Sequence, residues 1–208
     1  MAIGVAFSIK SNLGVSPVNS IPYVLSLVTK INQGLLTTII FSIYVLLQII
    51  ILRRQFKPIQ LLQIVFSGIF GYFVSFANFM LQGIESPSNY ILKLVFLGVS
   101  IFVVAVGILL YLTANIMPQP PEGLMLAICK KTGIQFHKMK ITFDSTVVVI
   151  AAAISFIAFG KLNGVREGTI ISAILIGKIL GALTKRWEST IVELIFNKNT
   201  NTFINQEE

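Results

Sequence analysis

Polar side chains gather at two proline-broken turns in an otherwise apolar sequence, and they are the residues best suited to bind something. One turn follows the apolar run that begins at Ala2, and the other follows the apolar run near 90–116. Amide, hydroxyl and carboxylate groups beside exposed helix ends can hold a small solute or ion. The candidate solute-site residues are Asn12, Ser16, Asn19, Asn115, Gln119 and Glu122. Because asparagine in a turn also caps helices, both roles stay open for Asn12 and Asn115.

Two charged residues, Asp144 and Lys178, lie inside apolar segments. A charge inside a bilayer is costly unless it is paired, hydrated or able to reach the headgroups. One alternative is an ion pair between Asp144 and Lys178. The other is that Asp144 sits near the start of its helix while Lys178 extends its charge toward the interface.

The sequence offers no arrangement typical of an enzyme or a metal site. His137 is the only histidine and lies in a lysine-rich turn, and Cys129 is the only cysteine. The carboxylates are few and scattered, which disfavours paired acid/base catalysis and a carboxylate metal cage. We therefore expect no catalytic residues, no metal site and no cofactor.

Composition places the chain in a membrane. Of its 208 residues, 55% are hydrophobic and 12% are charged, and the mean hydropathy is +0.86. So few polar side chains cannot cover a water-facing surface. The net charge of +8 comes from short basic clusters between apolar runs, which is the pattern of membrane loops and argues against a nucleic-acid partner.

Apolar runs of about 20 residues predict membrane-spanning helices. They lie near 35–52, 60–82, 90–116, 141–160 and 168–185. The first run, 2–13, is too short to span alone, and we interpret it as the end of a helix whose start is missing or as a short, partly inserted helix. Counting it makes six spans.

Two further segments are too short to cross and begin at prolines. They are "SPVNSIPYVLSLVTK" and "QPPEGLMLAICKKTG". Re-entrant or interfacial half-helices are one interpretation, because irregular backbone at membrane depth must be buried in protein or face a water-filled cavity. Ordinary amphipathic surface loops are the alternative.

The two halves of the chain resemble each other. Residues 2–31 align without a gap on 105–134, with identities at Ala2/Ala105, Gly4/Gly107, Asn12/Asn115, Pro17/Pro120, Thr29/Thr132 and Ile31/Ile134. Three spans in each half would give the copies opposite orientations. We predict one all-α integral membrane domain with about six transmembrane helices in two inverted three-span repeats, each with a short broken or re-entrant helix. Repeat 1 covers about 1–83, repeat 2 about 88–186, and a cytoplasmic interfacial helix and tail 187–208.

Small residues in 60–82 and 168–185 suit close helix packing. They are Gly68, Gly71, Ser75, Ala77, Gly168, Ser172, Ala173, Gly177 and Gly181. The basic clusters predict the orientation, because cytoplasmic loops are enriched in lysine and arginine. With six spans, the clusters at 53–57, 130–140 and 185–186 share one side, so both termini are expected to be cytoplasmic.

The sequence also resembles a known family. The stretches "AIGVAFSIKSNLGVSP", "MPQPPEGLMLAICKKTG", "KITFDSTVVVI" and "GVREGTIISAILIGKIL" are similar to the YczE/YyaS/YitT group of bacterial multipass membrane proteins. The resemblance implies a protein of the bacterial cytoplasmic membrane and supplies no substrate. It also implies that more apolar sequence usually precedes the equivalent of Ala2, and that Lys178 is unusual at its position.

Two functions follow from this architecture. The first is a transporter, or the solute-binding membrane subunit of one, for an unknown small solute. The second is a non-transporting scaffold or accessory factor that binds a protein or lipid partner. Membrane lipids are expected partners of either one, and a homo-oligomer or a partner subunit stays open.

Overall fold

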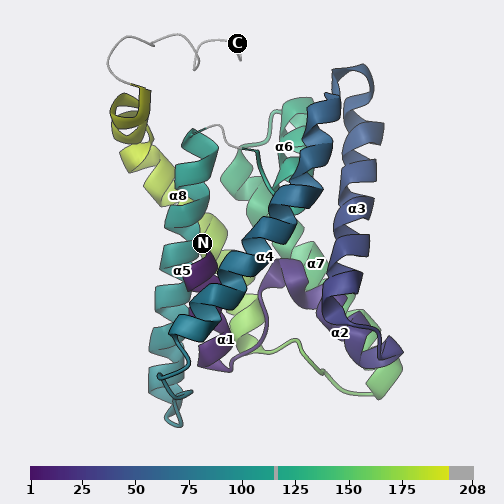
Figure 1. Cartoon of the computed structure of the whole chain (residues 1–208), viewed down its shortest axis with the longest axis vertical. Helices are drawn as coiled ribbons and strands as arrows, with labels where there is room; N and C mark the ends of the chain where they lie inside the picture. The colour runs from purple at the N-terminus through teal and green to yellow at the C-terminus, as the bar shows by residue number, and fades with distance from the viewer. Residues whose placement is uncertain (115–116, 197–208) are drawn as a thin grey trace.

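The described part of the chain is built from helices (Figure 1). The structure is a computed structural model that describes residues 1–114 and 117–196. The elements are α1 (Ala2–Ser11), η1 (Pro17–Asn19), α2 (Ser20–Thr29), α3 (Gln33–Leu52), η2 (Arg53–Gln55), η3 (Pro58–Leu61), α4 (Leu62–Met80), α5 (Tyr90–Thr113), α6 (Pro120–Thr132), α7 (Phe136–Phe159) and α8 (Glu167–Phe196).

Five helical segments of the described residues are long and apolar enough to cross a membrane. They are Gln33–Gln55, Pro58–Met80, Tyr90–Thr113, Phe136–Phe159 and Glu167–Trp187. These are the five full-length spans predicted from hydropathy, with ends shifted by a few residues. The largest shift is at α7, which begins at Phe136 instead of 141 because its polar first turn continues the helix. The all-α multipass membrane fold is confirmed.

Three shorter helices accompany the spans. Helix α1 ends at Asn12, whose φ of 52° is left-handed and breaks the helix. Helices α2 and α6 end similarly, at Lys30 with φ 62° and at Gly133 with φ 69°. In Figure 1 the chain turns back after α1 toward the middle of the molecule before α2 descends. Both proline-led segments are therefore short helices tucked between the long ones.

Helix pairing follows a regular pattern. Helix α1 packs on α5, α2 on α7 and α3 on α6. In a two-fold repeat, α1–α4 correspond to α5–α8 in order, so α2 corresponds to α6 and α3 to α7. The α2–α7 contact then corresponds to the α3–α6 contact, as such a repeat requires. The inverted repeat itself stays a prediction.

Helix α4 departs from this pattern. Helix α8, its counterpart in the predicted repeat, packs extensively along α5 and α7, whereas α4 packs on α1 and barely touches α3. Gln63 and Ala77 are the only buried residues among those of α4 whose burial is described. One wall of the molecule is thus held loosely.

Three clusters of buried apolar residues hold the remaining helices together. The largest joins the turn after α1 to α5 and α8 through Leu13, Ile101, Ile108 and Leu180 among others. The second joins α2 to α7 and α8, and the third joins α3 to α6. The core therefore lies around α5, α7 and α8, away from α4.

Two expectations are corrected by the packing. A Cβ at Gly168 or Gly177 would meet a neighbouring helix or turn within 3 Å, as close packing requires, but one at Gly68 or Gly71 would meet nothing within 4 Å. Gly68 and Gly71 of α4 therefore border open space, whereas Ala77 is buried. In addition, the predicted separate helix from 187 is the continuation of α8, because no glycine or proline interrupts the chain up to Phe196.

Candidate functional site

A cavity of about 500 Å³ lies inside the helix bundle. Every helix except α2 contributes to its wall, together with η1. The wall is mostly apolar, and polar side chains are grouped within it. This combination of a sizeable apolar cleft and a few polar groups is typical of sites for small organic ligands.

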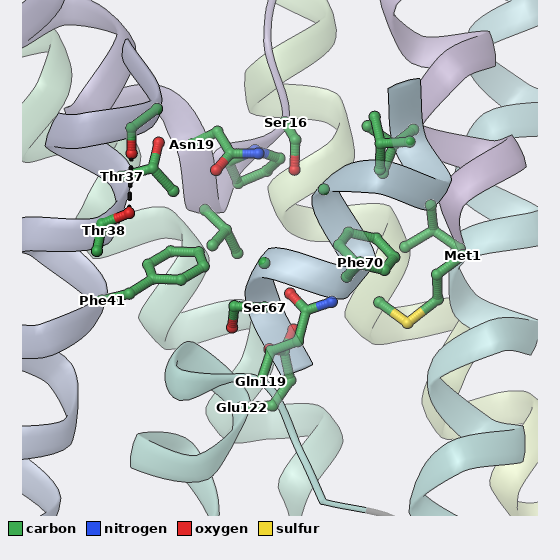
Figure 2. A pocket seen from close by; sticks show the side chains of 18 of the residues that line it. Met1, Ser16, Asn19, Thr37, Thr38, Phe41, Ser67, Phe70, Gln119 and Glu122 are labelled. Carbon is green, nitrogen blue, oxygen red and sulfur yellow. Dashed lines mark hydrogen bonds between the residues drawn. The ribbon is translucent and has the colours of Figure 1, made fainter. Parts of the chain in front are cut away.

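The two proline-led segments both reach this cavity. Ser16 and Asn19 line it from η1, and Gln119 and Glu122 line it from the start of α6. Figure 2 shows these pairs on two sides of the pocket, with Ser67 of α4 between them. Pro17 and Pro120 each occupy the first position of their helix, where a fixed φ and a missing N–H suit a helix start. The two prolines therefore start both short helices beside the cavity.

A buried charged cluster, consisting of Glu122, Lys140 and Asp144, forms part of the wall. Lys140 Nζ lies 3.5 Å from Glu122 Oε1 and 3.1 Å from Asp144 Oδ2. None of the three side chains is more than 4% exposed. Lys140 and Asp144 stand one helical turn apart on α7, so they share a face of that helix.

A pair of buried amides fastens α6 to its neighbours. Gln48 of α3 and Gln63 of α4 donate to each other's side-chain oxygens at 3.2 and 3.1 Å, and Gln48 also donates to the Pro120 carbonyl at 3.0 Å. A Cβ at Gly123 would lie 2.5 Å from the Gln63 oxygen, so glycine lets the amide pair lie against α6 without moving. The amide pair therefore fixes where α6 begins.

One end of the cavity reaches the surface at the start of α3. Asn32, Gln33 and Gly34 line the cavity and are exposed. The Asn32 side chain caps α3 by accepting from the backbone N–H of Gly34 at 2.8 Å. The turn that joins α3 to α4 lies at the opposite end of α3 (Figure 1). The cavity therefore opens away from the basic residues of that turn.

The candidate solute-site residues fall into three groups. Ser16, Asn19, Gln119 and Glu122 line the cavity. Asn12 does not: it is exposed, and its carbonyl accepts from the Arg166 guanidinium at 3.0 Å. Its left-handed backbone ends α1, so the capping role applies and the expected cavity role is corrected. Asn115 lies outside the described residues.

The two intramembrane charges do not pair with each other. Asp144 is buried and pairs with Lys140, whereas Lys178 is exposed on α8. The ion pair considered between Asp144 and Lys178 is therefore wrong. A lysine on the same helix face, four residues away, is the nearer partner.

Sequence reasoning missed Lys140, Gln48 and Gln63. Lys140 was grouped with the basic cytoplasmic cluster, although its four-residue spacing from Asp144 is the signal for an ion pair on one helix face. The two glutamines each stand in an apolar span, where a polar side chain has to find a partner. A glutamine inside an apolar span indicates that a partner exists, but it does not identify that partner.

Other chemistry is sparse in the described ranges, 1–114 and 117–196. They contain no group of three His, Cys, Asp or Glu side chains that could hold a metal ion. Cys129 is a free thiol on α6, and burial raises its pKa, which lowers its reactivity.

Comparison with known proteins gives a family and one relative. Residues 1–185 match a family described as a family of unknown function, DUF6198. The chain is 28% identical over 181 residues to a protein of Bacillus subtilis (strain 168) described as uncharacterized membrane protein YczE; the match covers 86% of this chain and 78% of that protein. No solved structure matches the chain.

Proposed function

Because the chain belongs to DUF6198, a family of unknown function, we propose from its structure that it is a transporter-like membrane protein that binds a small solute. The observation that carries this proposal is the central cavity, which both proline-led helix starts line together with a buried charged cluster. Broken helices that meet at a polar site between two related halves are a recurrent architecture of secondary transporters. A solute-binding membrane subunit of a larger transporter would use the same site.

Charges inside the bundle support a functional site. Buried ionisable groups in a membrane segment are costly, so they are rare outside pathways for solutes, ions and protons. An apolar filling would stabilise a purely structural bundle equally well. The cluster of Glu122, Lys140 and Asp144 therefore favours binding over packing alone.

The basic residues support an orientation in the bacterial cytoplasmic membrane. Arg53, Arg54 and Lys57 lie in the α3–α4 turn, Lys130 and Lys131 end α6, and Lys185 and Arg186 lie far along α8. Because α3, α4, α5, α7 and α8 alternate in direction, these groups share one end of the bundle (Figure 1). We propose that this end, with the C-terminal end of α8, is cytoplasmic and that the cavity opens outward. Met1 lines the cavity inside the bundle, so the cytoplasmic location expected for the N-terminus is not proposed.

The test uses a pair of matched glycine variants. Gly71 lines the cavity on α4, and Gly98 lies on an exposed face of α5; a Cβ at either position meets nothing within 4 Å. Purified wild type, Gly71→Leu and Gly98→Leu are screened by thermal shift against metabolites, lipids and ions. We expect at least one small solute to stabilise wild type and Gly98→Leu, and to lose its effect on Gly71→Leu because leucine fills the cavity.

The proposal fails if every stabilising solute acts equally on all three proteins, since the site would then lie elsewhere. A stabilising solute must next be taken up by vesicles that contain wild type and not by vesicles that contain Gly71→Leu. Binding without uptake would favour the solute-binding subunit over the transporter.

One observation favours the second candidate, an accessory factor that binds a lipid or protein. An apolar groove of about 570 Å³ runs between α1, α4 and α5, and Phe66, Phe73, Phe76 and Met80 line it. A lipid chain fits such a groove. Native mass spectrometry of the purified protein distinguishes the candidates: a tightly retained lipid, with no solute response in the screen, supports the accessory factor.

A further inference from the structure

The charged cluster of Glu122, Lys140 and Asp144 contains two carboxylates and one ammonium group. When all three are ionised, the cluster carries one net negative charge. A buried charge without a counter-charge is strongly unfavourable, so this site is suited to receive one positive charge.

The geometry shows where that charge would be received. Lys140 lies within 3.2 Å of both Asp144 oxygens but reaches only Oε1 of Glu122. Glu122 Oε2 and Asp144 Oδ2 are both buried beside the cavity and form no hydrogen bond among the described residues. Asp144 Oδ2 still lies 3.1 Å from the Lys140 ammonium, so Glu122 Oε2 is the oxygen with no cation beside it. In Figure 2 the Gln119 and Glu122 side chains point from the start of α6 toward Ser67. The unsatisfied acceptor is thus at the cavity wall.

The surroundings disfavour an anion in the same place. Helix starts bind anions through their first N–H groups, but Pro120 and Pro121 supply none at the start of α6, and the Gly123 N–H already donates to the Gln119 carbonyl. Glu122 itself occupies the first turn. The cluster's ammonium is already shared between two carboxylates. An incoming anion would face those carboxylates with no free counter-charge beside them.

The other polar groups near the cluster form no ion pair with its carboxylates among the described residues. The Tyr44 and Tyr111 hydroxyls are buried and have no hydrogen-bond partner among the described residues. Met1 also lines the cavity, but its backbone nitrogen lies against Gly107 of α5, and Figure 2 shows Met1 on the far side of Phe70 from Asn19. Among the described residues, no cation other than Lys140 lies within ion-pair distance of either carboxylate, so the cluster has no second counter-charge beside it.

Cavity size and lining indicate what carries the positive charge. A volume of about 500 Å³ is far larger than a bare ion needs and suits a compact organic molecule. Phe41 and Phe70 line the cavity, and aromatic faces attract organic cations. Ser16, Asn19 and Gln119 add oxygen atoms that accept hydrogen bonds from an ammonium group.

We propose that the cavity binds a small organic cation, an amine or ammonium compound with an apolar body, whose charge is held by Glu122. This inference rests on the proposed solute-binding function and names the chemical class of the solute. Lys140 and Asp144 then act as positioning residues, because their ion pair holds the Glu122 carboxylate in place through Oε1 and leaves Oε2 for the ligand.

The test compares three soluble probes that share a phenyl body and differ in charge: phenethylamine, which is protonated at pH 7, neutral 2-phenylethanol and anionic phenylacetate. Calorimetric titration of the purified full chain should show that phenethylamine binds at least about tenfold more tightly than 2-phenylethanol, with phenylacetate weakest. Glu122→Gln should abolish this preference. Glu167→Gln is the matched control, because the Glu167 side chain is 41% exposed, pairs with Arg166 and no other described residue, and does not line the cavity.

A structural role for Glu122 predicts a different result. Glu122→Gln leaves a neutral Lys140–Asp144 pair, so the folded state should keep or gain thermal stability while cation binding falls. If Glu122→Gln does not fold, the glycine variants Gly71→Leu and Gly98→Leu test whether the cation binds in the cavity. Cation binding must then disappear in Gly71→Leu and persist in Gly98→Leu.

Four outcomes overturn the inference: equal binding of 2-phenylethanol, preference for phenylacetate, retained cation preference in folded Glu122→Gln, or no binding of phenethylamine to wild type. The proposed function is judged separately by the solute screen. A neutral or anionic solute whose effect is lost in Gly71→Leu would leave the solute-binding cavity in place and reject only its assignment to cations.

Discussion

At the residue scale, the charged cluster depends on the single ammonium of Lys140. Each of its two carboxylate neighbours is buried, and the lysine is the only cation within hydrogen-bonding distance of either among the described residues. Removing one member of a buried ion pair leaves an uncompensated charge, which costs more than the pair contributes. Lys140 is therefore the residue whose loss the fold tolerates least in this site.

Lys140→Met keeps most of the side-chain volume and removes the charge. We expect it to lower the free energy of unfolding by about 3–5 kcal/mol, because two carboxylates are left facing each other. Lys138→Met, an exposed position on the same helix, should change it by less than about 0.5 kcal/mol. Chemical denaturation in detergent measures both.

Adding Glu122→Gln and Asp144→Asn to Lys140→Met supplies the control for this prediction. Neutralising both acids should restore much of the lost stability, since the cost arises from their charge. A triple variant as unstable as Lys140→Met alone would show that lysine packing, not charge, supports the site.

Sequence could point to residues of the cavity wall where a single position carried its own signal, although their role as a solute site stays a prediction. Proline and polar residues marked both helix starts, so Ser16, Asn19, Gln119 and Glu122 could be singled out as candidates without coordinates. Which atoms meet across the bundle could not be deduced, because the contacts of Gln48 with Gln63 join different helices. Asn12 shows the remaining ambiguity, since one residue type suits both a cap and a ligand.

At the element scale, hydropathy located every full-length span of the described chain to within a few residues, because the thickness of the bilayer fixes the length of an apolar helix. Composition could not tell a packed small residue from one that borders a cavity. Gly177 and Gly71 both stand in apolar helices, yet a Cβ at Gly177 would meet α7 and a Cβ at Gly71 would meet nothing within 4 Å. Packing partners, not local propensity, separate them.

This difference predicts opposite effects of the same substitution. At Gly177 a Cβ would lie 2.9 Å from the His137 carbonyl oxygen and closer still to Ile141, so Gly177→Leu should push α8 from α7 and cost several kcal/mol. Gly98→Leu should be neutral or stabilise by up to about 1 kcal/mol through helix propensity. Thermal unfolding of the two variants provides the comparison; equal stability would contradict the tight α7–α8 contact.

At the scale of the whole molecule, the alternating directions of α3, α4, α5, α7 and α8 place the α3–α4 turn and the α4–α5 turn at opposite ends (Figure 1). The proposed orientation therefore assigns these two turns to different sides of the membrane. Gln55 lies in the α3–α4 turn and Ser88 in the α4–α5 turn, and both residues are exposed.

Cysteine labelling in intact cells tests this assignment. In a Cys129→Ser background, a membrane-impermeant maleimide should label Ser88→Cys from outside, and Gln55→Cys only after the cells are permeabilised. The reverse pattern would place the basic end of the bundle outside. Equal labelling of both positions would contradict the crossing of α4.

The loose packing of α4 determines where the molecule opens locally. A helix with two described buried residues and little contact with α3 has a low free energy of local opening, so its amide hydrogens should exchange with solvent deuterium sooner than those of α8. Exchange followed by mass spectrometry in lipid nanodiscs should show this order for 62–80 against 168–180, and equal rates would contradict it. A solute in the cavity touches α4 on one side and α6 on the other, so it supplies the neighbour that α4 lacks. Slower amide exchange in α4 would then detect an occupied cavity even when the solute has not been identified.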